Sequence, residues 1–376
     1  MRIKQLEYYN KTLEWKLEPV DFSDLTLLVG VSGVGKSQIL KAIWNLRKIA
    51  NGSSLNGLVW NITFLTRNNS EYRWQGEFES KEETEEPIYE EDRDDEFKII
   101  YEKLFLDQRL IVDRDKSGII FHGEITPKLS PYKSIIEILN QEDDIAPAYN
   151  DFGKIIRSAR VRSENEVYRT PVMNFDELKE KYASLESIQE SDLALQVKLV
   201  LVHKNDPETF NKIREDFINM FPQVEDLTIK PIREKLPTIF DSTSFLKIKE
   251  KNVHTWIDQT QMSSGMLRSI IHISEIYLWP AGTVILIDEF ENSLGVNCID
   301  VLTENLLGQN RNLQFIITSH HPYIINNIGM EHWKIVTRNG GVVTVKDAKD
   351  FNLGKSRHDA FIQLINLESF KEGIAS

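Results

Sequence analysis

The clearest pattern near the start of the chain is a short apolar run, then a glycine-rich turn, then an amphipathic segment. Residues 25–29 read Leu-Thr-Leu-Leu-Val and are bounded by Gly30, which is typical of a buried strand. Residues 38–49 space their apolar side chains as a helix does. The pattern therefore predicts a strand, a turn over residues 30–37 and a helix.

Further along, alternation and periodicity predict a mixed α/β chain. Strands are expected over 58–78, strand and turn over 98–106 and 109–122, and mostly helix over 132–225. Strand character returns over 226–258. The remaining elements are a helix over 266–278, buried strands over 284–287 and 315–318, and a hairpin around 339–341.

Composition indicates a globular protein without a membrane span. Of the 376 residues, 41% are apolar and 27% are charged, which excludes a mainly disordered chain. No apolar run reaches the roughly 18 residues that a transmembrane helix needs, and the charged opening residues do not suit a signal peptide. Cys298 is the single cysteine, and no zinc-ligand spacing occurs. We therefore expect a cytoplasmic protein.

The net charge of −13 is concentrated in one stretch. Residues 77–96 hold twelve Asp or Glu residues against Lys81 and Arg93, a local net charge of −10, which leaves −3 for the rest of the chain. The stretch is either a solvated acidic loop, or a handle for a basic partner or a guard that repels nucleic acid. The charge balance does not favour a broad DNA-binding face, although a local basic groove stays open.

The strongest motif is the turn between the first predicted strand and helix. Residues 30–37 match the pattern G-x-x-x-x-G-K-[ST] in the context that this pattern requires. Glycines let backbone N–H groups surround phosphates, Lys36 reaches the β- and γ-phosphates, and the Ser37 hydroxyl can ligate Mg²⁺. The expected nucleotide-binding residues are Gly30, Ser32, Gly33, Val34, Gly35, Lys36, Ser37 and Gln38.

A second motif follows the strand predicted over 284–287, where Asp288 and Glu289 come directly after four apolar residues. Asp288 is expected to hold Mg²⁺ with Ser37, and Glu289 to act as general base or to orient the attacking water. Lys36 and Asp288 are 252 positions apart and must meet at one site. The chain between them must therefore leave the nucleotide core and return, which predicts a largely helical central insertion.

Ser264 and Gly265 precede the predicted helix 266–278. They either cap this helix or contact the γ-phosphate of a nucleotide that another subunit holds. Arg268 pairs with phosphate or forms a surface ion pair, and the sequence leaves both readings open.

His320 comes just after the predicted strand 315–318, within the segment Thr-Ser-His-His-Pro. It is expected to hydrogen-bond the γ-phosphate and so to sense its presence, and His321 is the weaker candidate. A lone histidine at a strand end is usually structural. The order of four motifs favours the functional role here.

The order of these motifs resembles ABC-type ATPase heads, and more narrowly the AAA-type core ATPases related to the RecF, SMC and OLD families. The resemblance is strongest over residues 25–46 and 262–328. It implies an α/β P-loop NTPase head of ABC type plus a mainly helical inserted lobe. The implied division is 1–130 and 241–376 for the head and 131–240 for the insertion, with ATP and Mg²⁺ as cofactors.

The resemblance also assigns roles. Asp288 and Glu289 correspond to Walker B and the catalytic carboxylate, Ser264 and Gly265 to the signature motif, and His320 to the switch histidine. The Walker A loop corresponds to Gly33, Gly35, Lys36 and Ser37.

Three departures from the family pattern stand out. Ser32 replaces a common Asn, and residues 294–296 read Leu-Gly-Val where Leu-His-Pro is common. No convincing glutamine loop is visible, and Gln75 and Gln108 are only candidates.

The group resembles ATPase subunits of bacterial anti-phage systems, with PARIS and Septu as plausible relatives. The implied protein is an ATP-hydrolysing switch whose two heads sandwich two ATP molecules in a homodimer or higher homo-oligomer. Because 56 residues follow His320, a nuclease or TOPRIM-type effector is expected on a separate chain.

Alternative functions are a nucleotide-gated scaffold with little hydrolysis and a RecF-like DNA-repair head. The near-neutral remainder of the chain weakens the second. A transporter ATPase is disfavoured because nothing indicates a membrane partner. A GTPase is disfavoured because no Asn-Lys-x-Asp motif appears.

Overall fold

The computed structural model describes residues 1–81, 96–158, 175–231, 244–308, 311–351, 357–366 and 373. Residues 82–95, most of the acidic stretch, lie outside the described residues, so neither interpretation of that stretch is tested. The chain forms two compact units. The first comprises Met1–Arg157, Gly282–Glu289 and Gln314–Ser376, and the second comprises Ser158–Ala281 and Phe290–Leu313.

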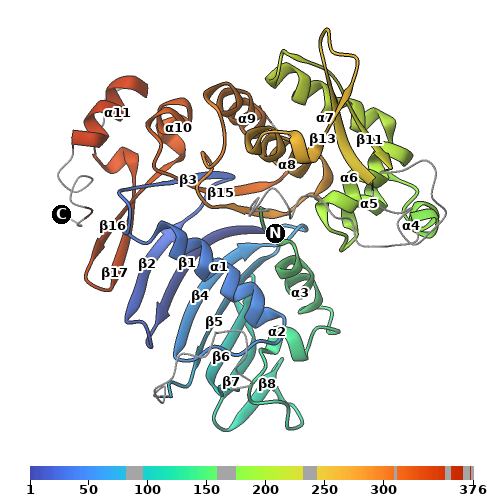
Figure 1. The fold of residues 1–376 in the computed structure, drawn as a ribbon. Coiled ribbons are helices and arrows are strands. Elements are labelled where there is room, and N and C mark those ends of the chain that lie inside the picture. Colours follow the sequence, from blue (N-terminus) through green and yellow to red (C-terminus); the bar gives the residue numbers. More distant parts are fainter. Residues whose placement is uncertain are drawn as a thin grey trace. The chain divides into compact units, whose positions relative to one another are not determined.

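The first unit is built on a 14-stranded mixed sheet (Figure 1). Its strand order is β10-β14-β15-β3-β16-β17-β2-β1-β4-β5-β6-β7-β8-β9. The strands are β1 (Arg2–Asn10), β2 (Trp15–Asp21), β3 (Leu25–Val29), β4 (Leu58–Leu65), β5 (Glu71–Phe78), β6 (Ile99–Leu106), β7 (Arg109–Asp115), β8 (Gly118–Phe121), β9 (Glu124–Ile125), β10 (Ile155–Arg157), β14 (Val284–Ile287), β15 (Gln314–Ser319), β16 (Trp333–Asn339) and β17 (Val342–Asp347).

Five neighbouring strands at one end of this sheet, β10, β14, β15, β3 and β16, run parallel. Every residue of β3, β14 and β15 is buried, which explains their almost continuous apolar sequences. The chain leaves parallel strands at the same edge of a sheet. The segments that follow Val29, Ile287 and Ser319 therefore start side by side.

The strands from β2 to β9 in the sheet order pair antiparallel. In β4 the residues alternate between buried and half-buried, because one face of this part covers the core. Aromatic rings fill that core: the ring centroids of Trp60 and Trp74 lie 5.1 Å apart, and so do those of Phe64 and Phe152.

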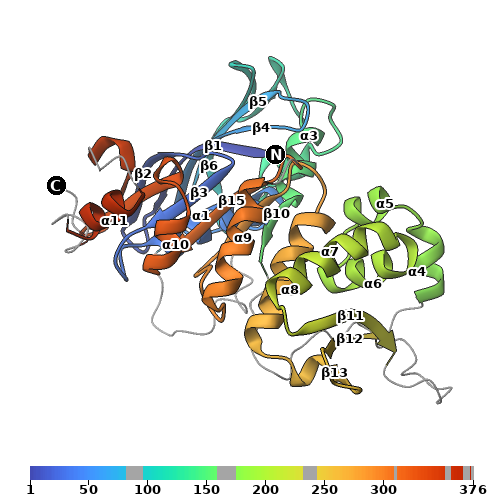
Figure 2. The same ribbon diagram turned by 90° about the horizontal axis from the view of Figure 1, so that it is seen from above.

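The helices of the first unit are α1 (Lys36–Ala50), α2 (Ile135–Ile138), α3 (Ala146–Gly153), α10 (Pro322–Asn327) and α11 (Arg357–Asn366), with short 3-10 helices at Met330–His332 and Ala348–Phe351. α1 buries Ile39, Ile43 and Leu46 at helical spacing against the sheet. α10 packs against α11 near the C-terminal end (Figure 2).

The second unit combines helices with a small antiparallel sheet of order β11-β12-β13. Its elements are α4 (Phe175–Lys181), α5 (Leu185–Glu190), α6 (Leu195–Asn205), α7 (Pro207–Met220), β11 (Val224–Pro231), β12 (Ser244–Glu250), β13 (Trp256–Asp258), a 3-10 helix at Gln259–Gln261, α8 (Ser264–Leu278) and α9 (Val296–Gly308). α7 packs against α6 and α8. Asp206 caps α7 and Pro207 occupies its first turn, both of which favour a helix start.

The predicted α/β fold class with a mixed sheet and helices is confirmed. The predictions for residues 38–49, 284–287 and the hairpin around 339–341 are confirmed by α1, β14 and the β16–β17 pair. The pattern does not predict β10, which lies inside a segment expected to be helical. Within the described residues, no helix is long and apolar enough to cross a membrane.

The two units divide the chain differently from the predicted segments. Residues 131–157 belong to the first unit, and residues 241–281 belong to the second. The helical insertion over 131–240, considered as a domain, stays a prediction.

Candidate nucleotide site

The glycine-rich loop connects β3 to α1, as the sequence predicts, and α1 begins at Lys36. The Lys36 ammonium donates hydrogen bonds to the carbonyl oxygens of Gly30 (2.7 Å) and Val31 (2.9 Å). Gly33 (φ 87°) and Gly35 (φ 106°) adopt left-handed backbone conformations that favour glycine. The loop thus presents a lysine and a helix N-terminus at one place, which suits an anion.

Residues of β16, β17 and β2 pack directly against this loop. A Cβ added at Gly30 would lie 2.6 Å from the carbonyl oxygen of Val336 on β16. One at Gly35 would lie 3.1 Å from Cγ2 of Val343 on β17 and 3.4 Å from Nε1 of Trp15. The loop backbone therefore lies directly against its neighbours at both glycines, so larger residues would displace it.

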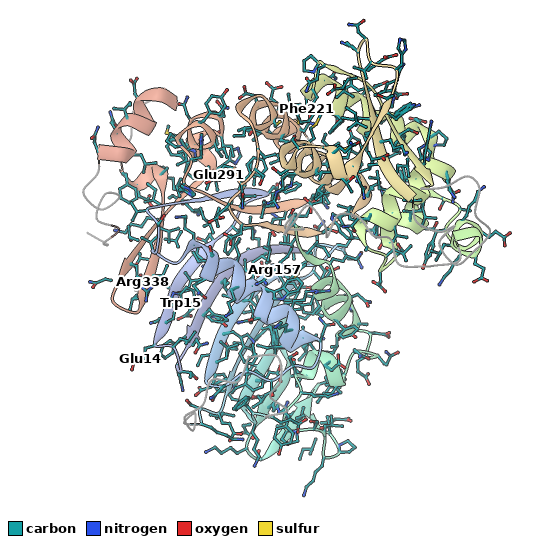
Figure 3. The ribbon with its side chains drawn as sticks, viewed as in Figure 1. Glu14, Trp15, Arg157, Phe221, Glu291 and Arg338 are labelled. Atoms are coloured by element: carbon teal, nitrogen blue, oxygen red, sulfur yellow. The ribbon has the colours of Figure 1, made fainter. Side chains whose placement is uncertain are left out.

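Gly373 packs on the side chains of the same loop. It is buried and has a φ of 67°, and an added Cβ would lie 2.7 Å from Cγ2 of Val31 and 2.7 Å from Cγ1 of Val34. Its carbonyl oxygen accepts a hydrogen bond from the backbone N–H of Arg338 at 2.6 Å. Arg338 and Trp15 belong to β16 and β2, and Figure 3 labels both on the same side of the first unit.

The end of β14 brings the second predicted motif to the first. The Ser37 hydroxyl donates to Oδ1 of Asp288 at 2.9 Å, so residues 251 positions apart in the sequence are in contact. Oδ1 of Asp288 also accepts from Oγ1 of Thr318 at 2.8 Å, and the backbone N–H of Glu289 donates to the same Oγ1 at 2.8 Å. Glu289 has a left-handed φ of 51°.

Strand order explains this convergence. β15 lies between β14 and β3, and Ile287 pairs with Ile317 while Val29 pairs with Ser319. The ends of all three strands are therefore neighbours. His320 follows β15 directly and is exposed, whereas His321 caps α10 by accepting the N–H of Tyr323 on Nδ1 at 3.2 Å. This structural role of His321 leaves His320 as the better candidate for contacting phosphate.

Most of the predicted site residues in the first unit are accessible to a ligand. Val34 is buried, and Gly35, Lys36 and Asp288 are half-buried. Six residues are exposed: Ser32, Gly33, Ser37, Gln38, Glu289 and His320.

The side-chain oxygens of Ser37 and Asp288 are suitable ligands for a magnesium ion that also binds the phosphates of a nucleotide. In the part of the chain that the structure describes, no group of three or more His, Cys, Asp or Glu side chains forms a metal site. Magnesium bound with nucleotides usually takes only one or two protein oxygens, and substrate phosphates and waters complete its shell. The adjacent oxygens of Ser37 and Asp288 are of the required kind.

Comparison with known families agrees with this arrangement. A protein family described as "AAA domain, putative AbiEii toxin, Type IV TA system" matches residues 25–326, most of the chain. The chain belongs to this AAA family. No curated protein matches the sequence. Membership supports nucleotide binding and ATPase activity in general.

Solved structures similar to this AAA protein include heads of SMC proteins. The crystal structure of an SMC head bound to the C-winged helix domain of ScpA has a TM-score of 0.54 and 16% identity, over 92% of this chain and 97% of that one. An SMC head with an extended coiled coil, bound to the C-terminal domain of ScpA and derived from Pyrococcus furiosus, has a TM-score of 0.47 and 14% identity, with 92% and 96% covered. The SMC head domain from Thermotoga maritima has a TM-score of 0.45 and 14% identity, with 92% and 99% covered. The first similarity supports the ABC-type P-loop head fold.

The predicted signature residues lie in the second unit, at the start of α8. Ser263 is the cap of this helix and accepts the N–H of Met266 on its hydroxyl at 3.2 Å, so Ser264 is the first helical residue. A Cβ added at Gly265 would lie 2.8 Å from the carbonyl oxygen of Ser293. The capping role therefore belongs to Ser263, and Ser264 is left exposed in the first turn.

Arg268 is 4% exposed, so its side chain does not lie at the surface of this unit. Gln75 lies on β5, six strand positions from β3, and Gln108 lies in the turn between β6 and β7. None of the strands β5, β6 and β7 is a neighbour of β14, β15 or β3 in the sheet. The sequence assigns no role to Thr318, although it is the first residue of the segment Thr-Ser-His-His-Pro, because its contacts depend on the pairing of β14 with β15.

Proposed function

We propose that this AAA protein binds Mg–ATP at the edge formed by β3, β14 and β15 and hydrolyses it as a molecular switch. The observation that carries the proposal is the hydrogen bond between Ser37 and Asp288, which joins the glycine-rich loop to the acidic strand end. Transfer of a phosphoryl group to water requires a loop that binds the phosphates, oxygen ligands for Mg²⁺ and a carboxylate that can act on the water. The glycine-rich loop, the oxygens of Ser37 and Asp288, and the exposed Glu289 are groups of these kinds.

Each residue has a distinct task in this proposal. Lys36 exchanges the carbonyl oxygens of Gly30 and Val31 for phosphate oxygens, and the backbone N–H groups of the loop bind the same anion. Mg²⁺, when bound by Ser37 and Asp288, neutralises charge that develops on the phosphates. Glu289 accepts a proton from the attacking water or orients it.

Three further residues complete the proposed site. His320 donates a hydrogen bond to the γ-phosphate, which suits its exposed position directly after β15. Ser264 and Gly265 of a second copy contact the γ-phosphate from the other side. The exposed Ser264 in the first turn of the 15-residue helix α8, where backbone N–H groups are unpaired within the helix, supports this assignment. The assembly is then a homodimer or higher homo-oligomer.

We further propose that the switch is the ATPase subunit of a cytoplasmic anti-phage system and acts on a separate nuclease or TOPRIM-type effector. The description of the matched family, which names a toxin of a type IV TA system, supports a role of this kind over membrane transport. The resemblance of the narrower RecF, SMC and OLD group to defence ATPases also favours it.

Substitution Glu289→Gln tests the hydrolytic switch. The amide cannot accept the proton of the attacking water, so we expect steady-state phosphate release to fall about a hundredfold while ATP binding is retained. Size-exclusion chromatography with light scattering should then show an ATP-dependent dimer that wild-type protein forms only transiently. Glu291→Gln, two residues along the chain, is the matched control.

Equal turnover by Glu289→Gln and wild-type protein would contradict the role of Glu289. If wild-type protein assembles with ATP but releases no phosphate, the molecule is a nucleotide-gated scaffold. Failure of wild-type protein to bind ATP at all would contradict the whole proposal.

A further inference from the structure

Thr318, the fifth residue of β15, joins two residues of the acidic motif through its hydroxyl group. Oγ1 lies 2.8 Å from Oδ1 of Asp288 and 2.8 Å from the backbone nitrogen of Glu289. A hydroxyl has one proton to donate, a carboxylate only accepts, and a backbone amide only donates. The directions are therefore fixed: Glu289 N–H donates to Thr318, and Thr318 O–H donates to Asp288.

The environment of Thr318 makes this connection rigid. The residue is 1% exposed, so water does not compete for either hydrogen bond. Ile317, the preceding residue, is paired with Ile287 on β14. The strand register thus holds the hydroxyl beside the first residues after β14, and this position does not depend on a loop.

The connection acts on a backbone that is uncommon for its residue type. Glu289 has a φ of 51°, in the left-handed region that residues other than glycine seldom adopt. Its N–H group is fixed by Thr318. Loss of this bond would let the peptide between Asp288 and Glu289 turn, and such a turn would move the Glu289 carboxylate away from its position next to Asp288.

We propose that Thr318 is a positioning residue for ATP hydrolysis, which holds the Glu289 carboxylate in register with the magnesium-binding oxygen of Asp288. The inference rests on the proposed function of this site. His320 comes two residues after Thr318, at the end of the same strand. The proposed contact of His320 with the γ-phosphate and the placement of Glu289 therefore both depend on the end of β15.

Three variants test the role of the hydroxyl. Thr318→Val keeps the shape of the side chain and removes both hydrogen bonds, and we expect kcat for ATP to fall about tenfold to a hundredfold with KM changed less than about threefold. Thr318→Ser keeps the hydroxyl and should restore most of kcat. Thr337→Val is the matched control, because Thr337 is also buried in a strand and its hydroxyl donates to the carbonyl of Thr344, at 3.4 Å, and not to the acidic motif.

Thermal unfolding and the Mg²⁺ concentration for half-maximal ATP binding are measured for each variant. We expect Thr318→Val to need more Mg²⁺ than Thr337→Val at a similar melting temperature. If Thr318→Val matches Thr337→Val in both kcat and Mg²⁺ requirement, the inference is wrong. If wild-type protein binds Mg–ATP without turnover, the hydrolysis proposal fails, and the Mg²⁺ requirement alone then decides whether Thr318 positions Asp288.

Discussion

The parallel and antiparallel parts of the large sheet bury their residues in opposite ways. β3 and β14 are buried along their whole length, so polar groups appear only after each strand ends. β4 in the antiparallel part has alternate residues buried, and polar groups occur along its other face. The first arrangement gathers Lys36, Asp288 and His320 at one edge, whereas the second spreads polar side chains over a surface.

This difference helps to distinguish charged side chains that have a structural role from those that can contact a ligand. Glu102 on β6 is fully buried, and burial raises the pKa of its carboxyl while hydrogen bonds and Arg114 lower it. Its oxygens accept hydrogen bonds from Trp74, from Ser134 and from the backbone of Ile135. Such a group is enclosed by the fold and held by its hydrogen-bond partners, so its role is structural. Glu289 at the parallel edge is exposed and free to meet a substrate.

The largest effect on function should come from Lys36→Ala. Removal of a cation that pairs with phosphates should weaken ATP binding by about a hundredfold or more, measured by isothermal titration calorimetry. Thermal unfolding should change little, since the parallel strands keep their packing. Lys41→Ala, on the same helix, is the control. Similar affinities of the Lys36→Ala and Lys41→Ala variants for ATP would contradict the proposal that the parallel edge binds the nucleotide.

The converse test is Gly76→Ala in the antiparallel part. An added Cβ would collide with the ring of Trp60, which is fully buried, so the core must rearrange. We expect a loss of about 1–3 kcal/mol in the free energy of unfolding, measured with urea, and unchanged ATP affinity in the folded protein. Gly153→Ala is the control, because in the part of the chain that the structure describes no atom lies within 4 Å of its added Cβ. Adding Trp60→Phe should recover part of the loss.

Much of the parallel edge could be predicted from the sequence. The apolar runs before Gly30 and Asp288 fix two buried strands, and each run is followed at once by its polar motif. Parallel pairing then places these motifs together, and the contact between Ser37 and Asp288 agrees with that expectation. The physical reason is that the periodicity and the chemistry are both local in sequence.

Contacts that depend on strand pairing, or on where the chain returns to the sheet, could not be predicted. β10 is only three residues long, and its pairing with β14 overrides a helical pattern around it. Thr318 acts through the strand register, which a single sequence does not reveal. The acceptor role of the Gly373 carbonyl depends on where the C-terminal part of the chain returns to the sheet.

The smallest effect is expected from Gly373→Ala, which tests whether packing on the phosphate loop adjusts ligand affinity. The new methyl would meet Val31 and Val34, 2.7 Å away, so the loop must move, and we expect ATP affinity to fall about fivefold to tenfold. Gly340→Ala is a close control, because Gly340 also has a positive φ (57°) but no atom of the described residues lies within 4 Å of its added Cβ. Both variants carry similar backbone strain, so only the steric contact with the loop distinguishes them. Adding Val31→Ala should recover part of the affinity. Equal affinities of the two glycine variants for ATP would show that the loop keeps its shape without close packing by Gly373. Tight packing would then affect ATP binding no more at the parallel edge than in the antiparallel part.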